Sequence, residues 1–256
     1  MTQEKLTFAS EFGDELAGRL DTPDDRVPRG YVLFAHCFTG SKDVLAAVRI
    51  AKALWLRGFA VFRFDFTGLG ESEGDFANTT FSSNVGDLVA AASFLRDSRE
   101  APTVLIGHSL GGAAVLASAS KIPEARAVCT IGAPADPEHV VHHFADARDK
   151  IEADGEAEVS IGGRPFRIKW SFLEDIEGHN LEDSIRVMRK ALLVFHSPVD
   201  GIVGIENARR IYEAARHPKS FVCLDSADHM LTDRADAYYV AEVISAWAGR
   251  YNKETV

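Results

Sequence analysis

The sequence predicts an α/β fold, in which helices cover both faces of a mostly parallel sheet. Short, continuously apolar runs such as residues 31–35 and 60–64 alternate along the chain with stretches of helical apolar spacing. Continuous apolar runs are typical of strands buried on both faces, and their alternation with helices favours parallel pairing. A second observation is that the apolar run 103–106 leads through a Gly-x-Ser-x-Gly motif, residues 107–111, into a small-residue helix at 113–120.

Composition narrows the class of protein. The chain has 256 residues, 46% of them hydrophobic, which is enough for one large core, so we expect a single domain over residues 1–256. The formal net charge of −10 argues against a nucleic-acid partner or an anionic membrane surface. The first ten residues include Glu4 and Lys5 and do not resemble a signal peptide, and no apolar run is long enough to span a membrane. A cytoplasmic location is therefore expected.

The three cysteines, Cys37, Cys129 and Cys223, favour free thiols over a disulfide framework. Their number is odd, they show no C-x-x-C spacing, and each lies in or beside an apolar run. We expect all three to be buried and reduced, which suits a reducing compartment.

The regular elements follow from apolar spacing and turn residues. Residues 6–10 and 15–20 flank Gly13-Asp14 and predict an antiparallel hairpin at the sheet edge. Ser82 or Ser83 is expected to cap a helix over 84–96. The remaining strands are expected at 31–35, 60–64, 104–106, 127–131, 191–195 and 221–224, and the remaining helices at 44–57, 113–120, 205–215 and 235–250.

The alternation breaks at residues 134–190, which are more polar and too long for a simple connection. We call this segment the insertion. It is expected to contain a helix over 136–147, a hairpin over 158–168 and short helices over 170–176 and 185–188. Ligands of open α/β sheets bind at the carboxyl ends of the strands, so the insertion is expected to form a lid there.

Ser109 is the candidate nucleophile. A strand that turns sharply into a helix at a serine needs glycines two residues to either side, since side chains there would collide. The turn would expose the hydroxyl above the N-terminus of a helix, where free N–H groups favour negative charge. The alternative is a tight turn with an incidental serine.

A serine hydroxyl needs a base, and the base needs an orienting acid. Asp200 follows one late strand and His229 follows the next, so both can converge on Ser109 at one edge of the sheet. Asp225 and Asp228 are the competing carboxylates. Asp225 could form local hydrogen bonds, and Asp228 directly precedes the histidine and points elsewhere.

Two backbone N–H groups are expected to stabilise an oxyanion. One belongs to Leu110, immediately after the nucleophile, and the other to Phe38, in the loop after the first parallel strand. Phe38 is also expected to form a wall of the substrate pocket.

The other histidines have structural explanations. His36, His108 and His196 lie at the sheet edge and are expected to hold loops, and His108 is also a candidate substrate-binding residue because it adjoins Ser109. His139, His142 and His143 have a helical spacing that could bind a metal, but no second ligand cluster supports one. We therefore expect no metal and no cofactor.

Three large aromatic residues of the insertion are further candidates for substrate binding. These residues, Phe166, Trp170 and Phe172, lie in an otherwise polar stretch, and their large apolar side chains are expected to contact another apolar surface. They either pack the insertion onto the body or line the acyl or alcohol pocket above Ser109.

These motifs together resemble the α/β-hydrolase superfamily over nearly the whole chain. Residues 34–40, Phe-Ala-His-Cys-Phe-Thr-Gly, look like its His-Gly-Phe-type oxyanion loop, with Cys37 in place of glycine. Residues 63–74 and the Gly162-Gly163 hairpin are similar to small bacterial cinnamoyl and feruloyl esterases. Residues 196–200 and 217–221 resemble the hydrolase half of bifunctional α/β-hydrolase/OsmC-type proteins. The 256 residues hold no counterpart of the OsmC-type domain, so this resemblance implies the hydrolase activity alone.

The expected fold is thus an α/β-hydrolase fold with an N-terminal hairpin and an inserted lid. The expected activity is that of a serine carboxylesterase on small acyl or aryl esters. A thioesterase or peptidase with the same three residues is the nearest alternative, and a non-catalytic α/β-hydrolase-like binding protein is a more distant one. The expected partner is a small-molecule ester, and the oligomeric state stays open, a homodimer included.

Overall fold

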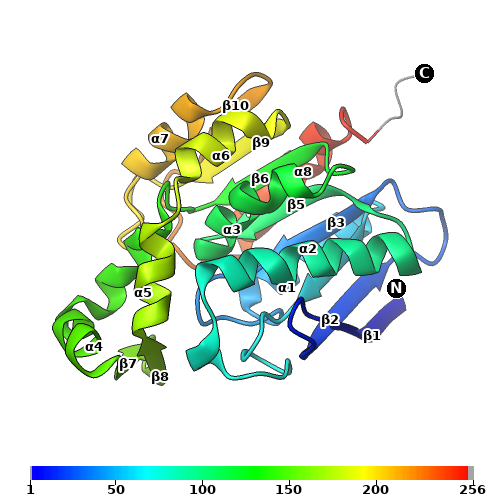
Figure 1. The fold of residues 1–256 in the computed structure, drawn as a ribbon. Coiled ribbons are helices and arrows are strands. Elements are labelled where there is room, and N and C mark those ends of the chain that lie inside the picture. The colour runs from blue at the N-terminus through cyan, green and yellow to red at the C-terminus, as the bar shows by residue number, and fades with distance from the viewer. Residues whose placement is uncertain (1, 253–256) are drawn as a thin grey trace.

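The central sheet has eight strands in the order β1-β2-β4-β3-β5-β6-β9-β10, drawn in a computed structural model that describes residues 2–252 (Figure 1). The pairs β1/β2 and β2/β4 are antiparallel and every other neighbouring pair is parallel. The parallel strands are β3 (Tyr31–Ala35), β4 (Ala60–Phe64), β5 (Pro102–His108), β6 (Ala127–Ile131), β9 (Ala191–His196) and β10 (Lys219–Cys223). This is the mixed, mostly parallel sheet that the sequence predicts.

The N-terminal hairpin forms the antiparallel edge of the sheet, as expected. β1 (Thr2–Ala9) and β2 (Glu15–Thr22) are longer than the apolar alternation indicates. Gly13 lies in the turn at φ +95°, a backbone conformation that a side chain would strain. β2 pairs with β4 and so joins the hairpin to the parallel part of the sheet.

Helices cover both faces of the sheet. α1 (Leu45–Leu56) and α8 (Arg234–Ala248) share one hydrophobic cluster with the strands of one face. The helices α2 (Phe81–Ser98), α3 (Leu110–Ser118) and α7 (Glu206–Ala214) contribute to the larger cluster on the other face, which also receives apolar side chains of the insertion.

The start of α2 differs from the prediction. Its N-cap is Thr80, not Ser82 or Ser83, so the helix begins earlier than expected. The Thr80 hydroxyl accepts a hydrogen bond from the N–H of Ser83, and the Ser83 hydroxyl accepts one from the N–H of Thr80. This reciprocal capping box satisfies two N–H groups at once, which a cap at either serine would not do.

The insertion contains the expected hairpin and two short helices, but the helix expected over 136–147 is a kinked 3₁₀ segment, and a further short helix, α4 (Arg148–Asp154), was not predicted. In chain order the elements are the kinked 3₁₀ segment η3 (Pro137–Ala147), α4, the hairpin β7 (Glu156–Ile161) and β8 (Arg164–Lys169), α5 (Trp170–Glu177) and α6 (Leu181–Met188). The hairpin lies with α4 and α5 to one side of the sheet (Figure 1). Hydrogen bonds attach the insertion to the rest of the protein. Lys169 Nζ donates to Asn78 Oδ1 at 2.6 Å, and the N–H of Ser82 donates to Asp175 Oδ2 at 2.8 Å.

The cysteines differ from the expectation at one position. All three are free, and Cys37 and Cys129 are buried, but Cys223 is exposed. It ends β10, an edge strand with an open side, so the apolar run there is covered less than a central strand would be. None of the helices in residues 2–252 combines the length and the apolar character that a bilayer crossing requires.

Candidate active site

Ser109 occupies the sharp turn between β5 and α3 in a strained backbone conformation, with φ 55° and ψ −127°. The flanking glycines are required for steric reasons. A Cβ on Gly107 would lie 2.2 Å from the carbonyl oxygen of Gly111, and a Cβ on Gly111 would lie 2.3 Å from that of His36. The turn thus brings the start of α3 directly against the end of β3.

Ser109, His229 and Asp200 form a chain of hydrogen bonds. The Nε2 atom of His229 lies 3.0 Å from Ser109 Oγ, and its Nδ1 atom lies 2.7 Å from Asp200 Oδ2. The three residues come from the turns after β5, β9 and β10, so the parallel sheet brings them to one edge, as the sequence predicts.

Asp200 is held by more than the histidine. Its side chain is 2% exposed, and its Oδ1 atom accepts hydrogen bonds from the N–H groups of Ile202 and Val203, each at 2.9 Å. Burial alone would raise the pKa of Asp200, but the hydrogen bonds from His229 and these backbone groups outweigh it, and the pKa is lowered. Asp200 is therefore an ionised carboxylate in a fixed orientation.

Gly132, which sequence reasoning missed, makes room for this pair. It follows β6 with φ +54°, and a Cβ there would lie 3.2 Å from Asp200 Oδ2 and 3.3 Å from His229 Nδ1. Its N–H donates to the carbonyl oxygen of Phe195 at 3.0 Å, so the backbone cannot move away freely. The only signal in the sequence for this role is that Gly132 directly follows a predicted strand.

The competing carboxylates lie elsewhere. The Asp228 carboxylate accepts hydrogen bonds from the N–H and hydroxyl of Thr232, and Asp225 is exposed with φ +41°. Neither makes a hydrogen bond to His229 in the part of the chain that the structure describes.

His108 holds a loop, and its assignment to substrate binding is wrong. Its side chain is fully buried, and Nε2 donates to the backbone carbonyl of His229 at 2.7 Å. Burial, with help from the neighbouring imidazole of His229, lowers its pKa to about 4, so it is neutral near pH 7. The sequence places it next to Ser109, but strand alternation turns its side chain to the opposite face.

His196 and His36 also hold loops, as expected. His196 Nε2 donates to the carbonyl oxygen of Val203 at 2.7 Å, and His36 Nδ1 donates to that of Cys37 at 2.8 Å. Burial lowers the pKa of both imidazoles. The first bond fixes the turn after β9, which carries Asp200, and the second fixes the loop after β3, which carries Phe38.

The N–H groups of Phe38 and Leu110 lie near Ser109 and have no hydrogen-bond acceptor in residues 2–252. Leu110 is the first residue of α3, where the N–H groups have no partner within the helix. Residues 37–39, Ser109 and His229 line one cavity, while Phe38 and Leu110 line a narrow space beside it. The predicted pair of donors is thus available at the surface next to the serine.

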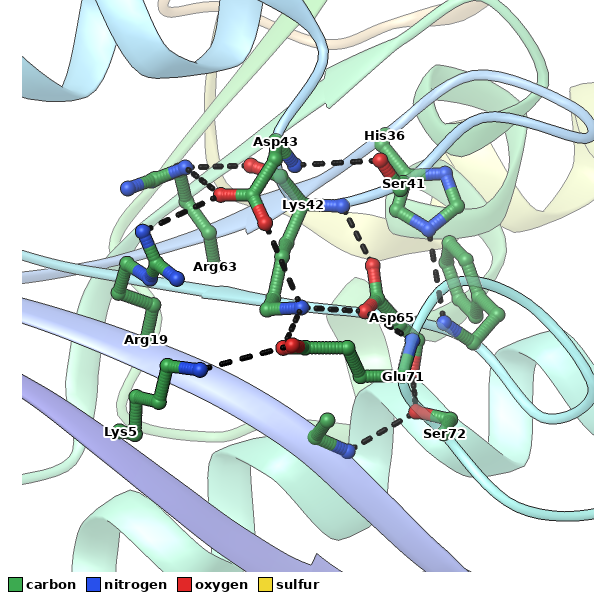
Figure 2. A network of polar contacts seen from close by, with 12 residues as sticks. Lys5, Arg19, His36, Ser41, Lys42, Asp43, Arg63, Asp65, Glu71 and Ser72 are labelled. Atoms are coloured by element: carbon green, nitrogen blue, oxygen red, sulfur yellow. Dashed lines mark hydrogen bonds and ion pairs between the residues drawn. The ribbon is translucent and has the colours of Figure 1, made fainter.

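A buried charge network supports the loop that carries Phe38 (Figure 2). Asp65, directly after β4, accepts a hydrogen bond from the backbone N–H of Lys42 and another from its ammonium, each at 2.6 Å. The Lys42 ammonium also contacts Glu71 at 2.7 Å, and the guanidinium of Arg63 donates to the Lys42 carbonyl oxygen. Lys42 and Asp65 side chains are 1% and 0% exposed, so this pair is shielded from water. Sequence reasoning did not find it.

The cavity beside Ser109 and His229 has a volume of about 330 Å³. Apolar side chains form much of its wall and come from well-separated segments, namely Val44, Ile161, Ile202 and Met230. Cys37 also lines it, and burial raises the pKa of its thiol to about 11, so it is no thiolate near pH 7.

The three aromatic residues of the insertion do not line this cavity. Phe172 is 2% exposed and packs behind Phe38, with ring centroids 5.7 Å apart. Phe166 packs edge-on against Phe76 at 5.0 Å, and Trp170 is 37% exposed. The contacts of Phe172 and Phe166 favour the packing of the insertion onto the body, and a role of the three residues in substrate binding stays a prediction.

His139, His142 and His143 do not form a metal site with other ligands. No group of three or more histidine, cysteine, aspartate or glutamate side chains within residues 2–252 could hold a metal ion. His139 Nε2 donates to the carbonyl oxygen of Ile202 at 2.8 Å, which ties η3 to the turn after β9. His143 lines the cavity beside Ser109.

Comparisons with known proteins show which proteins resemble this chain in sequence and fold. The family model for serine aminopeptidase, S33, matches residues 26–152. The esterase domain of a Rhodothermus marinus protein is 52% identical, with a TM-score of 0.81 over 99% of this chain and 100% of that one. Mouse (Mus musculus) palmitoyl-protein thioesterase ABHD10, mitochondrial, is 27% identical over 215 residues, 81% of this chain and 71% of that protein.

A further structure shares the fold alone. Est1E from Butyrivibrio proteoclasticus with bound ferulic acid is 19% identical, with a TM-score of 0.78 over 96% of this chain and 98% of that one. The match to the Rhodothermus domain extends over nearly the whole length of both chains, so the likeness covers the entire fold. This chain is a hydrolase of the α/β-hydrolase superfamily.

Proposed function

We propose that this hydrolase is a serine carboxylesterase that acts on small acyl or aryl esters. The observation that carries the proposal is the hydrogen-bonded chain from Asp200 through His229 to Ser109, which opens on a cavity large enough for a small ester. The esterase domain of the Rhodothermus protein, 52% identical, supports the ester as the substrate class.

The reaction follows from the positions of these groups. Ser109 Oγ attacks the ester carbonyl carbon as His229 Nε2 takes the hydroxyl proton. The tetrahedral oxyanion accepts hydrogen bonds from the N–H groups of Phe38 and Leu110. The C–O bond to the alcohol then breaks, and His229 gives its proton to the departing oxygen. Asp200 keeps Nδ1 of His229 protonated and stabilises the imidazolium.

Deacylation repeats the sequence with water. His229 takes a proton from water as its oxygen attacks the acyl carbon of the ester on Ser109. The new tetrahedral intermediate collapses to the free acid, and the proton returns to Ser109 Oγ. The chain's own residues supply every proton transfer, so the scheme has no step that requires a cofactor.

Substitution of the serine tests the proposal. Ser109→Ala should retain the fold and lose hydrolysis of p-nitrophenyl acetate by a factor on the order of 10⁴ or more. Labelling by a fluorophosphonate probe should disappear as well. Ser160, exposed on β7, provides the control, since Ser160→Ala should keep both properties. Hydrolysis by Ser109→Ala within tenfold of the parent would refute the assignment.

A thioesterase is the second candidate, because the relative ABHD10 is named as one. Peptide hydrolysis is the third, because of the description of the matching family model. The proposed machinery acts on the acyl carbon and does not by itself distinguish the leaving atom. A matched ester, thioester and amide with the same acyl group would rank the three by kcat/KM.

A further inference from the structure

The charged residues that line the cavity beside Ser109 differ in sign from the net charge of the chain. The sequence contains 38 acidic and 28 basic residues. Among residues 2–252, no aspartate or glutamate lines the cavity, whereas Arg164 does. Arg164 is exposed, so water screens its charge at a distance, and it acts on a ligand mainly through direct contact. The cavity beside the reacting groups thus has one exposed cation at its edge, in a protein that is acidic as a whole.

Arg164 opens β8, directly after the Gly162-Gly163 turn of the insertion. Its Nη2 atom donates a hydrogen bond to the carbonyl oxygen of Thr39, in the loop that carries Phe38. Its guanidinium also lies over the Phe166 ring, 5.3 Å from the centroid. The side chain is thus anchored in place at the edge of the cavity, and its position does not depend on a bound ligand.

The guanidinium has no acidic partner within residues 2–252. Arg148 and Arg167, also in the insertion, do have acidic partners: Arg148 pairs with Glu152 and Glu177, and Arg167 pairs with Asp75 and Glu156. A guanidinium carries five N–H donors, and the contact with Thr39 uses one of them. Several donors of Arg164 are consequently available for a ligand.

His143 contributes a second polar group to the same cavity, from η3. Partial burial, together with the nearby imidazoles of His139, His229 and His142, lowers its pKa. His143 is then mostly neutral near pH 7 and offers a hydrogen bond without a charge. The permanent charge on the cavity wall is that of Arg164.

We propose that the preferred substrate is an ester that carries a carboxylate, on its acyl or its alcohol part, and that this carboxylate pairs with Arg164. The inference rests on the proposed esterase function and names the substrate class for that site. A carboxylate can accept two parallel hydrogen bonds from a guanidinium, a geometry that lysine does not offer. Monoesters of dicarboxylic acids and esters of hydroxycarboxylic acids are the chemical classes that fit.

Matched substrate pairs test the proposal on both sides of the ester bond. For the acyl side, mono-p-nitrophenyl adipate is compared with p-nitrophenyl hexanoate, each corrected for its spontaneous hydrolysis. For the alcohol side, 3-acetoxybenzoate is compared with methyl 3-acetoxybenzoate. On at least one side, kcat/KM for the charged ester should exceed that for the neutral one by about tenfold or more, as charge-assisted hydrogen bonds allow.

Arg164→Gln should remove this preference, and Arg164→Lys should keep part of it. Arg167→Gln, on the same strand but outside the cavity, is the matched control and should leave the ratio unchanged. Loss of the Thr39 contact should slow both members of a pair alike, so the ratio isolates the charge. The preference of the parent should also weaken as NaCl rises from about 0.05 to 0.5 M.

Two results would overturn the inference. One is a parent enzyme that shows no preference for the charged ester on either side, and the other is a preference that survives in Arg164→Gln. In either case Arg164 would serve only to hold Thr39. Failure of the underlying esterase function is distinguishable, because neutral ester hydrolysis would then persist in Ser109→Ala.

Discussion

Gly132 lies close to the side chains of Asp200 and His229, and its replacement by alanine should affect both the stability and the rate of the enzyme. The new Cβ would lie 3.2 Å from Asp200 Oδ2 and between 3.3 and 3.4 Å from the His229 ring. These contacts are tight enough that the neighbours must shift by a few tenths of an ångström. Asp200 is held by two backbone N–H groups, so the displacement falls mainly on His229 and its approach to Ser109.

The size of the effect follows from this displacement. A misplacement of ~1 Å in an active site can cost ~100-fold in rate, so a shift of a few tenths should cost roughly tenfold in kcat. Independently, an L-residue forced to the left-handed φ of Gly132 costs about 1–2 kcal/mol in the free energy of unfolding. The substitution therefore affects both stability and rate, and the two must be separated.

Gly155 provides the control. It lies at φ +83° after α4, and a Cβ there would meet no atom within 4 Å. Gly155→Ala should thus lose a similar free energy of unfolding, measured by urea denaturation, and keep its kcat for p-nitrophenyl acetate. Gly132→Ala should lose both. If the two variants had equal kcat values, the reasoning from the contacts of Gly132 would be refuted.

Three further predictions concern buried or competing carboxylates. Asp200→Asn should lower kcat by ~10⁴-fold by disturbing the tautomer of His229. Asp225 is exposed, so Asp225→Asn should change kcat only a few-fold. If steady-state kinetics gave the reverse order, Asp225 would be the residue that orients His229. Asp65→Asn should lower the free energy of unfolding by ~1–3 kcal/mol, since it removes the buried carboxylate that pairs with the Lys42 ammonium and leaves only the half-exposed Glu71 and Asp43. Lys5 forms an exposed ion pair with Glu71, so Lys5→Ala should lower the free energy of unfolding by less than about 1 kcal/mol. Equal losses for the two variants in urea denaturation would contradict the difference expected between a buried and an exposed pair. Burial raises the pKa of Asp87 to about 6, above the unfolded value of 3.8, so this carboxylate destabilises the folded state increasingly as pH rises from about 4 to 6. The stability of Asp87→Asn relative to the parent should therefore increase over that range, by up to ~3 kcal/mol, and a pH-independent difference would contradict the shift.

The strands that the sequence predicts most accurately are those buried on both faces. β3, β4 and β6 have the expected boundaries, because each is a run of five residues with every side chain buried. The hairpin strands β1 and β2 extend beyond the expectation, since strands at a sheet edge contain exposed polar residues that break the apolar pattern. Boundaries were thus predictable where burial alone determines the residue type.

The three reacting side chains could be placed together from the sequence for a topological reason. Ser109, Asp200 and His229 each follow a strand of the parallel part of the sheet, and the carboxyl ends of parallel strands meet at one edge. The supporting residues follow no such rule. The pairing of Lys42 with Asp65 and the close approach of Gly132 depend on how loops pack against one another, which no local spacing specifies.

The insertion shows most clearly where sequence reasoning fails and why. Side chains alternate across a strand, so Arg164, Phe166 and Ile168 share one face of β8. That alternation was available in the sequence, but it does not decide which member of the face reaches the cavity. The docking of the hairpin decides: Ile168 is buried in the core, Phe166 packs on Phe76, and Arg164, next to the turn, extends to Thr39. Because substrate pockets are mostly apolar, sequence reasoning selects Phe166 as the candidate for substrate contact. In the structure the Phe166 ring packs against Phe76, since the contact between the hairpin and the body also buries apolar surface. The charged residue stays at the cavity because its donors cannot be buried without an acceptor, and a substrate carboxylate is an acceptor of that kind.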